Sequence, residues 1–352
     1  HSTGKALPNG AVGNTALGYR ALETGNNAGT DYNTIVGWQA GLAITAAKEN
    51  TIIGAGAGEA MTTTINTVLI GYDAGTTINH TDANGSVMIG HRAGRAVTSA
   101  IGSILIGSGS GADLTTGDTN TIIGHRAFRV ATTADANTMV GSFTGVSMTT
   151  GKYNAVLGYQ AMSTATTASG SVFIGRDAGG TVTTGNHNIG IGHDAMNGGG
   201  VSGDCNIAIG SSAGDALTSG PGNVLIGKQA GDGFTANTTM TLIGSEAGTA
   251  INSNNANGTV AVGYQSLASL TSGATNTALG TRSGDAANTA SGSVFLGNNA
   301  GGTVTTGNQN IAIGLDSMNG GTTTGDNNIA IGVSAGDALT SGYQNVLMGL
   351  DA

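Results

Sequence analysis

Aromatic and histidine side chains recur at one position of this sequence, directly after a glycine that closes a short repeated phrase. Such rings can stack on sugars, so this position could contact a receptor or a glycan. The alternative is that the rings only cover the edge of a coil or a groove between chains. The residues concerned are Tyr19, Trp38, Tyr72, His91, His125, Tyr159, His193 and Tyr264.

The histidines do not predict a metal centre or a catalytic site. His91, His125 and His193 lie two and then four repeats apart, about 10 and 19 Å at a strand spacing of about 4.8 Å, which is too far for one metal ion. No histidine pairs with a stacked acid, and no Ser/His/Asp set or carboxylate pair interrupts the repeat. We therefore expect no catalytic, cofactor-binding or metal-binding residues, and no enzyme.

Two glycine-rich stretches and several acidic turns deserve the same test. GAGAGE at 54–59 and GSGSG at 107–111 lie within the repeat, and neither opens a helix, so they do not predict a phosphate site. Asp118, Asp204 and Asp326 lie beside asparagines and could ligate Ca²⁺. No calcium-binding nonapeptide repeats, however, so turn formation is the simpler interpretation.

Composition excludes several classes of protein. The 352 residues include 64 glycines and one cysteine, and only 9% are charged. The net charge of −9 argues against a nucleic-acid partner, which needs basic patches. No apolar run approaches the roughly 18 residues needed to cross a bilayer, so membrane insertion is not expected. Aliphatic residues recur throughout, which argues against disorder.

The phrase is one unit of a period that covers the chain. It occurs 20 times, closing at glycines from Gly18 to Gly349, and 14 of the 19 gaps are 17 residues long. Two gaps have 18 residues and three have 19, and we expect their extra residues to bulge at turns and leave the strand columns in register. The segment 170–192 returns almost unchanged at 292–314. A fixed short period is typical of a solenoid, so we expect a lead-in at 1–13 and one continuous solenoid over 14–352.

The repeated columns predict an all-β parallel β-solenoid, or β-roll, of about 20 coils with two short strands in each. The residues one and three before the glycine are almost always aliphatic or threonine, and we expect them to face the core. On this interpretation Ile174→Asp would disrupt the core. A second apolar column follows seven residues after the glycine. An asparagine four residues before the glycine in 13 copies predicts a ladder of stacked amides.

The middle residue of the strand, two before the glycine, is also apolar in most copies. If its neighbours face the core, alternation turns this column outward, and burial between chains would remove the exposed stripe. The alternative is a flattened coil in which this column is internal. The residues expected to pack between chains are Ile35, Leu69, Met88, Leu105, Met139, Phe173, Leu225, Phe295 and Leu347.

The phrases NTALGYRAL, NTIVGWQAG, NAVLGYQAM and NTIIGHRAF carry a family resemblance. They resemble the Asn-Thr/Gly-rich repeats of phage tail fibres and the head repeats of trimeric autotransporter adhesins. The adhesin resemblance implies three chains packed side by side. We therefore expect a homotrimeric, non-catalytic fibre or shaft at a virion tail or extracellular surface, which presents or contributes to binding of a host receptor or glycan.

Other functions remain open at this point. Within the same class, the chain could be a bacterial surface adhesin or an extracellular filament subunit. The threonine column eight residues after the glycine could offer hydroxyls to ice, although a second outward column is mixed in composition. A depolymerising tailspike would need a carboxylate pair in a groove between chains.

Overall fold

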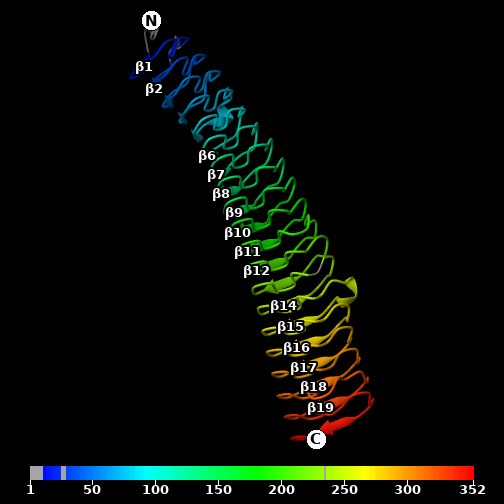
Figure 1. Cartoon of the computed structure of the whole chain (residues 1–352). Helices are drawn as coiled ribbons and strands as arrows, with labels where there is room; N and C mark the ends of the chain where they lie inside the picture. The colour runs from blue at the N-terminus through cyan, green and yellow to red at the C-terminus, as the bar shows by residue number, and fades with distance from the viewer. Residues whose placement is uncertain (1–10, 25–28, 234) are drawn as a thin grey trace. The chain divides into compact units, whose positions relative to one another are not determined.

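Within each part of the chain, every motif glycine follows a three-residue β-strand, and that strand pairs in parallel with the strand of the next coil. A computed structural model describes residues 11–24, 29–233 and 235–352. They form two units, residues 1–171 and 172–352, which are described separately. Both units are all-β parallel solenoids with the predicted period (Figure 1). Residues 1–10 of the expected lead-in lie outside the described residues.

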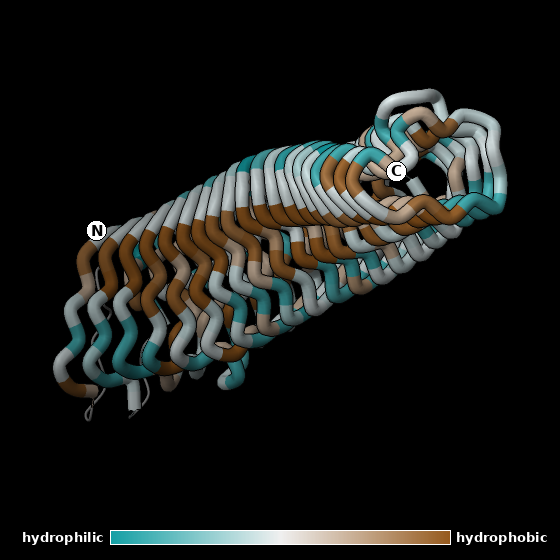
Figure 2. The backbone as a smooth tube through the Cα atoms, turned by 90° about the horizontal axis from the view of Figure 1, so that it is seen from below, coloured by the Kyte–Doolittle hydropathy of each residue, from teal (hydrophilic) through white to brown (hydrophobic). Residues whose placement is uncertain are grey.

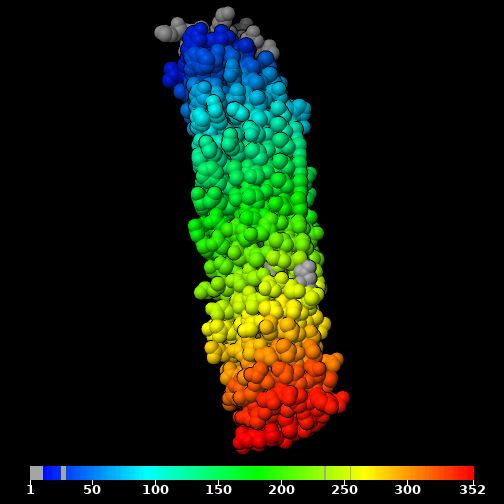
Figure 3. Space-filling model, turned by 45° about the vertical axis from the view of Figure 1, so that its right-hand side comes forward, coloured from blue at the N-terminus to red at the C-terminus, as the bar shows by residue number. Residues whose placement is uncertain are grey.

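The strands of the two units are equally short and evenly spaced. Those of the first unit are β1 (Thr15–Leu17), β2 (Thr34–Val36), β3 (Thr51–Ile53), β4 (Val68–Ile70), β5 (Val87–Ile89), β6 (Ile104–Ile106), β7 (Thr121–Ile123), β8 (Thr138–Val140) and β9 (Ala155–Leu157). Those of the second unit are β10 (Val172–Ile174), β11 (Ile189–Ile191), β12 (Ile207–Ile209), β13 (Val224–Ile226), β14 (Thr241–Ile243), β15 (Val260–Val262), β16 (Thr277–Leu279), β17 (Val294–Leu296), β18 (Ile311–Ile313), β19 (Ile329–Ile331) and β20 (Val346–Met348). The space-filling view shows the coils within each unit packed closely on the face that it presents (Figure 3).

The longer gaps add residues at turns and leave the strand register unchanged. Two of the three 19-residue gaps each contain one turn of 3₁₀-helix, η1 (Thr81–Ala83) and η2 (Asn254–Ala256). On either side of η1, Leu69 still pairs with Met88, and the strands that flank η2 keep the same register. The expected bulging of extra residues at turns is confirmed for these two gaps. The third gap includes residues 25–28, which lie outside the described part of the chain.

The motif glycines allow neighbouring coils to approach through their backbones. Gly54 has φ +139°, a conformation that L side chains rarely adopt, and a Cβ at this residue would lie 2.3 Å from the carbonyl oxygen of Gly71. The backbones of these two coils therefore lie so close together that there is no room for a side chain at this position. This close approach explains why the closing residue of the phrase is invariably glycine.

The asparagine ladder is present and buried, as predicted. Nδ2 of Asn50 donates to Oδ1 of Asn33 at 2.9 Å and to the carbonyl oxygen of Thr64 at 3.0 Å. In the second unit, Nδ2 of Asn223 donates to Oδ1 of Asn206 at 2.9 Å. Each amide thus replaces the water it loses on burial with hydrogen bonds to the neighbouring coils.

The middle residues of the strands lie inside their own coil, so their predicted role in packing between chains is wrong. Leu347, in the last strand, is half-buried. The others have no exposed surface: Ile35, Leu69, Met88, Leu105, Met139, Phe173, Leu225 and Phe295. The flattened coil that was the alternative is the arrangement found. Alternation then turns the residues one and three before the glycine outward, the reverse of the expected assignment.

The reason lies in how the interior is filled. A Cβ on Gly190, the residue that pairs with Phe173 in the next strand, would lie 2.5 Å from the Phe173 ring. A Cβ on Gly179 would lie equally close to it. At this place in the second unit, a large middle residue fills space left by the small residues around it. The outer columns need no such compensation and are mainly β-branched.

The second apolar column is also internal, but its segment does not form the second strand that we expected. Ile44, Met61 and Val182 are fully buried, whereas Phe234 lies outside the described residues. Beyond the strands named above, the described chain has one isolated parallel bridge, Val304 to Thr323. The threonines that follow this column instead form single hydrogen bonds between coils, as from Oγ1 of Thr115 to the carbonyl of Thr132 at 2.8 Å.

Candidate ligand-binding surface

The residues predicted to contact a receptor or glycan all lie on the surface, at the first position of the turn after a strand. In the first unit these are Tyr19, Trp38, Tyr72, His91, His125 and Tyr159, and in the second unit His193 and Tyr264. Trp38 exposes 53% of its surface and Tyr72 exposes 51%. The expected exposure is therefore found, whereas their contact with a ligand stays a prediction.

The turn backbone explains this exposure. After the motif glycine, the first residue points outward, the second adopts a left-handed conformation and the third is a buried small residue. In the coil that contains Arg126, φ at that residue is +52° and Ala127 has no exposed surface. Non-glycine residues take this left-handed conformation in coil after coil, so the position displays side chains at a fixed angle.

In the first unit, the structure brings several of these rings together. The rings of Tyr72 and His91 stack with centroids 5.5 Å apart and an interplanar angle of 12°. His125 meets Phe143 edge to face at 5.1 Å, and Phe143 meets Tyr159 in the same way at 6.2 Å. Sequence reasoning missed Phe143 because it occupies the second turn position, one residue past the aromatic column.

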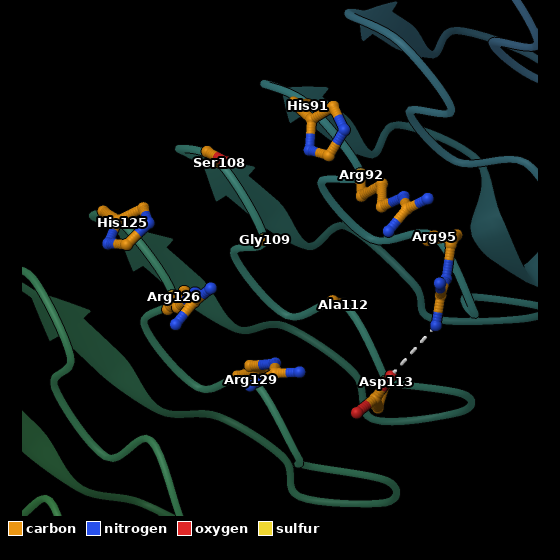
Figure 4. A pocket seen from close by; sticks show the side chains of 10 residues that line it. All are labelled: His91, Arg92, Arg95, Ser108, Gly109, Ala112, Asp113, His125, Arg126 and Arg129. Carbon is orange, nitrogen blue, oxygen red and sulfur yellow. Dashed lines mark hydrogen bonds and ion pairs between the residues drawn. The ribbon is translucent and has the colours of Figure 1, made fainter.

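A basic pocket separates these two aromatic groups. Three rows of side chains line it, one from each of three successive coils, and its volume is about 190 Å³. Figure 4 shows the outer rows on either side of a middle row with small side chains. The rows are His91, Arg92 and Arg95; Ser108, Gly109, Ala112 and Asp113; and His125, Arg126 and Arg129.

The pocket concentrates positive charge in an acidic chain. It holds four of the seven arginines in the sequence, and Asp113 is the one carboxylate that lines it. Nη2 of Arg95 lies 3.4 Å from Oδ1 of Asp113, and Nε of Arg92 lies 3.7 Å from Oδ2 of Asp73 in the preceding coil. Arg126 and Arg129 are exposed and have no ion-pair partner within the described part of the chain.

In the second unit, several of the corresponding turn positions carry acids. Burial raises the pKa of Asp215, and the nearby charge of Asp194 adds to this effect. Burial also raises the pKa of Asp232.

In the first unit, by contrast, burial alone would raise the pKa of Asp135, but the hydrogen bond from Lys152 and further favourable contacts lower it below its ordinary value.

Among the described residues, one group of three side chains could together hold a metal ion: Asp177, His193 and Asp194. Their potential ligand atoms all lie within 4.8 Å of one another. The expectation that no histidine pairs with a stacked acid is therefore wrong for His193, because Asp177 of the adjacent coil belongs to this group. Nδ1 of His193 also lies 2.9 Å from Oδ2 of Asp194. Arg176 lies 3.5 Å from Asp177, and Asn197 donates to Asp194 at 3.1 Å. Arg176 thus offsets the charge of one carboxylate, and Asn197 gives Asp194 a hydrogen bond, so these side chains already have partners within the chain.

The acidic turn residues connect neighbouring coils. Asp118 Oδ1 accepts a hydrogen bond from the backbone N–H of Ile101 at 2.8 Å. Asp204 accepts from the N–H of Asn186 at 2.6 Å. Asp326 accepts from the N–H of Asn308, also at 2.6 Å. This arrangement agrees with a role in the turns and adds no evidence for Ca²⁺.

None of the helical turns within the described ranges has the length and apolar character required to cross a membrane. Comparison with known proteins identifies no relative: no family model matches the chain, and no curated protein matches it significantly.

Proposed function

We propose that this chain is a non-catalytic structural segment of a fibre and that it associates side by side with copies of itself. The observation that carries the proposal is the outward face of the strands. In both units this face consists of two columns of mainly β-branched residues, and Figure 2 shows apolar segments recurring at the same place in successive coils. A strand face exposed to water would normally be polar.

The outward face is most apolar in the second unit. Residues three before the glycine are valine or isoleucine in nine of its 11 strands, the exceptions being Thr241 and Thr277. Residues one before the glycine are aliphatic or methionine throughout. Several of them are clearly exposed: Ile174 at 39%, Leu279 at 48% and Leu296 at 41%.

The size of this face matches a protein interface. Complete burial of one aliphatic side chain corresponds to roughly 60–120 Å² of apolar surface, from about 1.5–3 kcal/mol at about 25 cal/mol per Å². If about a third of each side chain is exposed, the 22 outward positions of the second unit offer on the order of 400–900 Å². Monomers rarely expose so large an apolar patch, and one partner of a stable complex buries about 800 Å².

The number of chains comes from the resemblance to trimeric adhesins, so the proposed state is a homotrimer. Its interface would use the outward columns in place of the middle column. The proposed location is a phage tail or another extracellular surface, where the fibre would present or contribute to binding of a host receptor or glycan. No contact with nucleic acid and no insertion into a membrane are part of the proposal.

Sedimentation of the purified chain tests the proposal. We expect a species of about 102 kDa, three times the 34.1 kDa of one chain, that persists on dilution to low concentration. Electron microscopy of the same sample should show uniform elongated particles. A chain that sediments as a stable 34 kDa monomer would contradict self-association, and with it the fibre.

A further inference from the structure

We propose that the basic pocket of the first unit binds the acidic groups of an anionic saccharide, with the flanking aromatic rings supporting neighbouring sugars. The site is lined by two copies of one motif, G-H-R-A-x-R, at residues 90–95 and 124–129. The copies are separated by two periods, so their strands lie about 9.6 Å apart, twice the ordinary strand spacing.

The coil between the two motifs creates the space. At the positions where its neighbours carry histidine, arginine and arginine, it carries Ser108, Gly109 and Ala112. Cγ of Arg126 lies 3.6 Å from the place where Gly109 would carry a Cβ, so the stem of this arginine lies beside the gap. The glycines of GSGSG therefore act by lacking side chains, and they do not resemble a phosphate loop at a helix terminus.

The charges favour a ligand with oxyanion groups. Arginine presents a planar fork that pairs bidentately with carboxylate, sulfate or phosphate. Arg95 forms an ion pair with Asp113, and Arg92 forms one with Asp73. Arg126 and Arg129 have no acidic partner within the described ranges. The four arginines exceed the two acids, so the pocket keeps a net positive charge that a bound anion would neutralise.

The surroundings favour a saccharide over a simple anion. A pocket of about 190 Å³ is smaller than the roughly 300–1,000 Å³ of typical ligand sites, so it holds one acidic unit and the rest of a longer ligand must lie outside. On one side the ligand would meet the stacked pair Tyr72 and His91, and on the other side His125, Phe143 and Tyr159. Aromatic faces of this kind offer apolar contact to sugar rings while their polar atoms remain hydrated.

The saccharide identity rests on the proposed fibre function, because a fibre at a cell surface meets glycans; the oxyanion site itself does not. Calorimetry on the full chain with three probes tests the saccharide identity and the oxyanion site separately. Oligogalacturonate of four residues carries rings and carboxylates, maltotetraose carries rings alone, and inorganic pyrophosphate carries oxyanions alone. We expect binding of oligogalacturonate, much weaker binding of pyrophosphate and none of maltotetraose.

Three variants locate the site. Arg126→Gln should weaken oligogalacturonate binding about tenfold or more, because a charge-assisted bidentate contact is lost. Ser108→Tyr should abolish binding by filling the middle row, and the fold should accept it because Tyr72 and Tyr159 occupy the same turn position in other coils. Arg282→Gln is the matched control, since Arg282 has the same turn position in a coil of the second unit outside the pocket.

Each outcome decides the inference. Equal loss of binding in Arg282→Gln would overturn the pocket as the site, and so would full binding by Ser108→Tyr that melts like the parent chain. Pyrophosphate binding as tight as that of oligogalacturonate would overturn the saccharide and leave an oxyanion site. No binding of either charged probe would overturn both. A monomer in sedimentation that still binds oligogalacturonate through Arg126 would end the fibre proposal and keep the pocket.

Discussion

The carboxamide of Asn50 lies between two coils and donates to Oδ1 of Asn33, 17 residues earlier, at 2.9 Å. Its own Oδ1 accepts from the backbone N–H and the hydroxyl of Thr67, 17 residues later, at 2.9 and 2.6 Å. One buried side chain thus connects three coils. A polar group can stabilise a dry interior only when all its hydrogen bonds are made, and here they are.

We predict that Asn50→Ala is strongly destabilising. The change removes the Asn50 side chain as hydrogen-bond partner of three buried groups: the Asn33 oxygen, the Thr64 carbonyl and the Thr67 donors. We expect the free energy of unfolding to fall by about 2–5 kcal/mol. Asn50→Thr is the control, because threonine occupies the same position at Thr67 and keeps a hydroxyl there. Urea unfolding measures both. Equal stability of the alanine and threonine variants would show that the ladder contributes little.

Gly54→Ala should be more harmful than an alanine at an open glycine. The new Cβ would meet the Gly71 carbonyl oxygen at 2.3 Å, which forces the coils apart and costs about 1–3 kcal/mol or more. Gly349 has a similar φ of +130°, but a Cβ there would lie 3.8 Å from its nearest neighbour, Cβ of Ala352. Gly349→Ala therefore carries the backbone cost without the clash. Thermal melts that rank the two variants in the opposite order would refute the close approach as the cause.

The reversed assignment of strand faces gives a paired prediction at adjacent residues. Phe173→Asp should prevent folding around its coil, because it buries a charge without a partner. Ile174→Asp should leave the fold intact, because Ile174 is 39% exposed, and should weaken association of the chains. Circular dichroism and sedimentation distinguish these effects. Loss of β-structure in Ile174→Asp would restore the assignment expected from sequence.

Asp215 should make the second unit less stable at neutral pH. Its pKa is raised chiefly by burial, so the ionised form is disfavoured in the folded chain. The penalty is complete above the folded-state pKa and disappears as the pH falls below the unfolded value of about 3.9. Asp215→Asn should therefore raise stability at pH 7, by less than about 1 kcal/mol at this partly exposed position, and change nothing near pH 3.

Asp337→Asn is the control for this effect, since Asp337 has the same turn position but is exposed. Urea midpoints at both pH values provide the measurement. A gain for Asp215→Asn that persists at pH 3 would show that charge is not its origin.

Asp135 should behave in the opposite way. Its folded-state pKa is lowered because the Lys152 contacts outweigh the effect of burial. The contribution to stability is thus present above the unfolded value of about 3.9 and is lost as the pH falls through the folded value. Lys152→Gln should lower the unfolding midpoint at pH 7 and leave it unchanged at the acidic end. A deficit that is constant with pH would contradict this ion pair.

Local regularities made much of the fold predictable. Period, strand position, the Asn ladder and the turn insertions all depend on contacts between identical positions one coil apart, and a single sequence displays those positions directly. The direction of each strand face depends instead on packing between different columns. The pairing of Phe173 with Gly190, a large residue against the smallest, was the signal that this column is internal.

The candidate site shows the same division. Exposure of Tyr72 and His91 followed from their place after the glycine. The basic pocket did not, because His91 and His125 were compared only as metal ligands. Comparing whole turns two periods apart would have shown Arg92 and Arg126 in equivalent positions, with Gly109 between them. Sites of this kind need three coils to be considered together.

The unchanged register across gaps of 17, 18 and 19 residues has a consequence for how such a gene can change. Because Leu69 meets Met88 as directly as Ile52 meets Leu69, the sheet does not depend on which coil follows which. Unequal crossing-over between similar coils would then add or remove whole periods in register, and packing would be kept wherever a large middle residue such as Phe173 still meets a small one. The near-copy of 170–192 at 292–314 has the form such an exchange would leave, so coil number can change by whole periods while the cross-section is preserved.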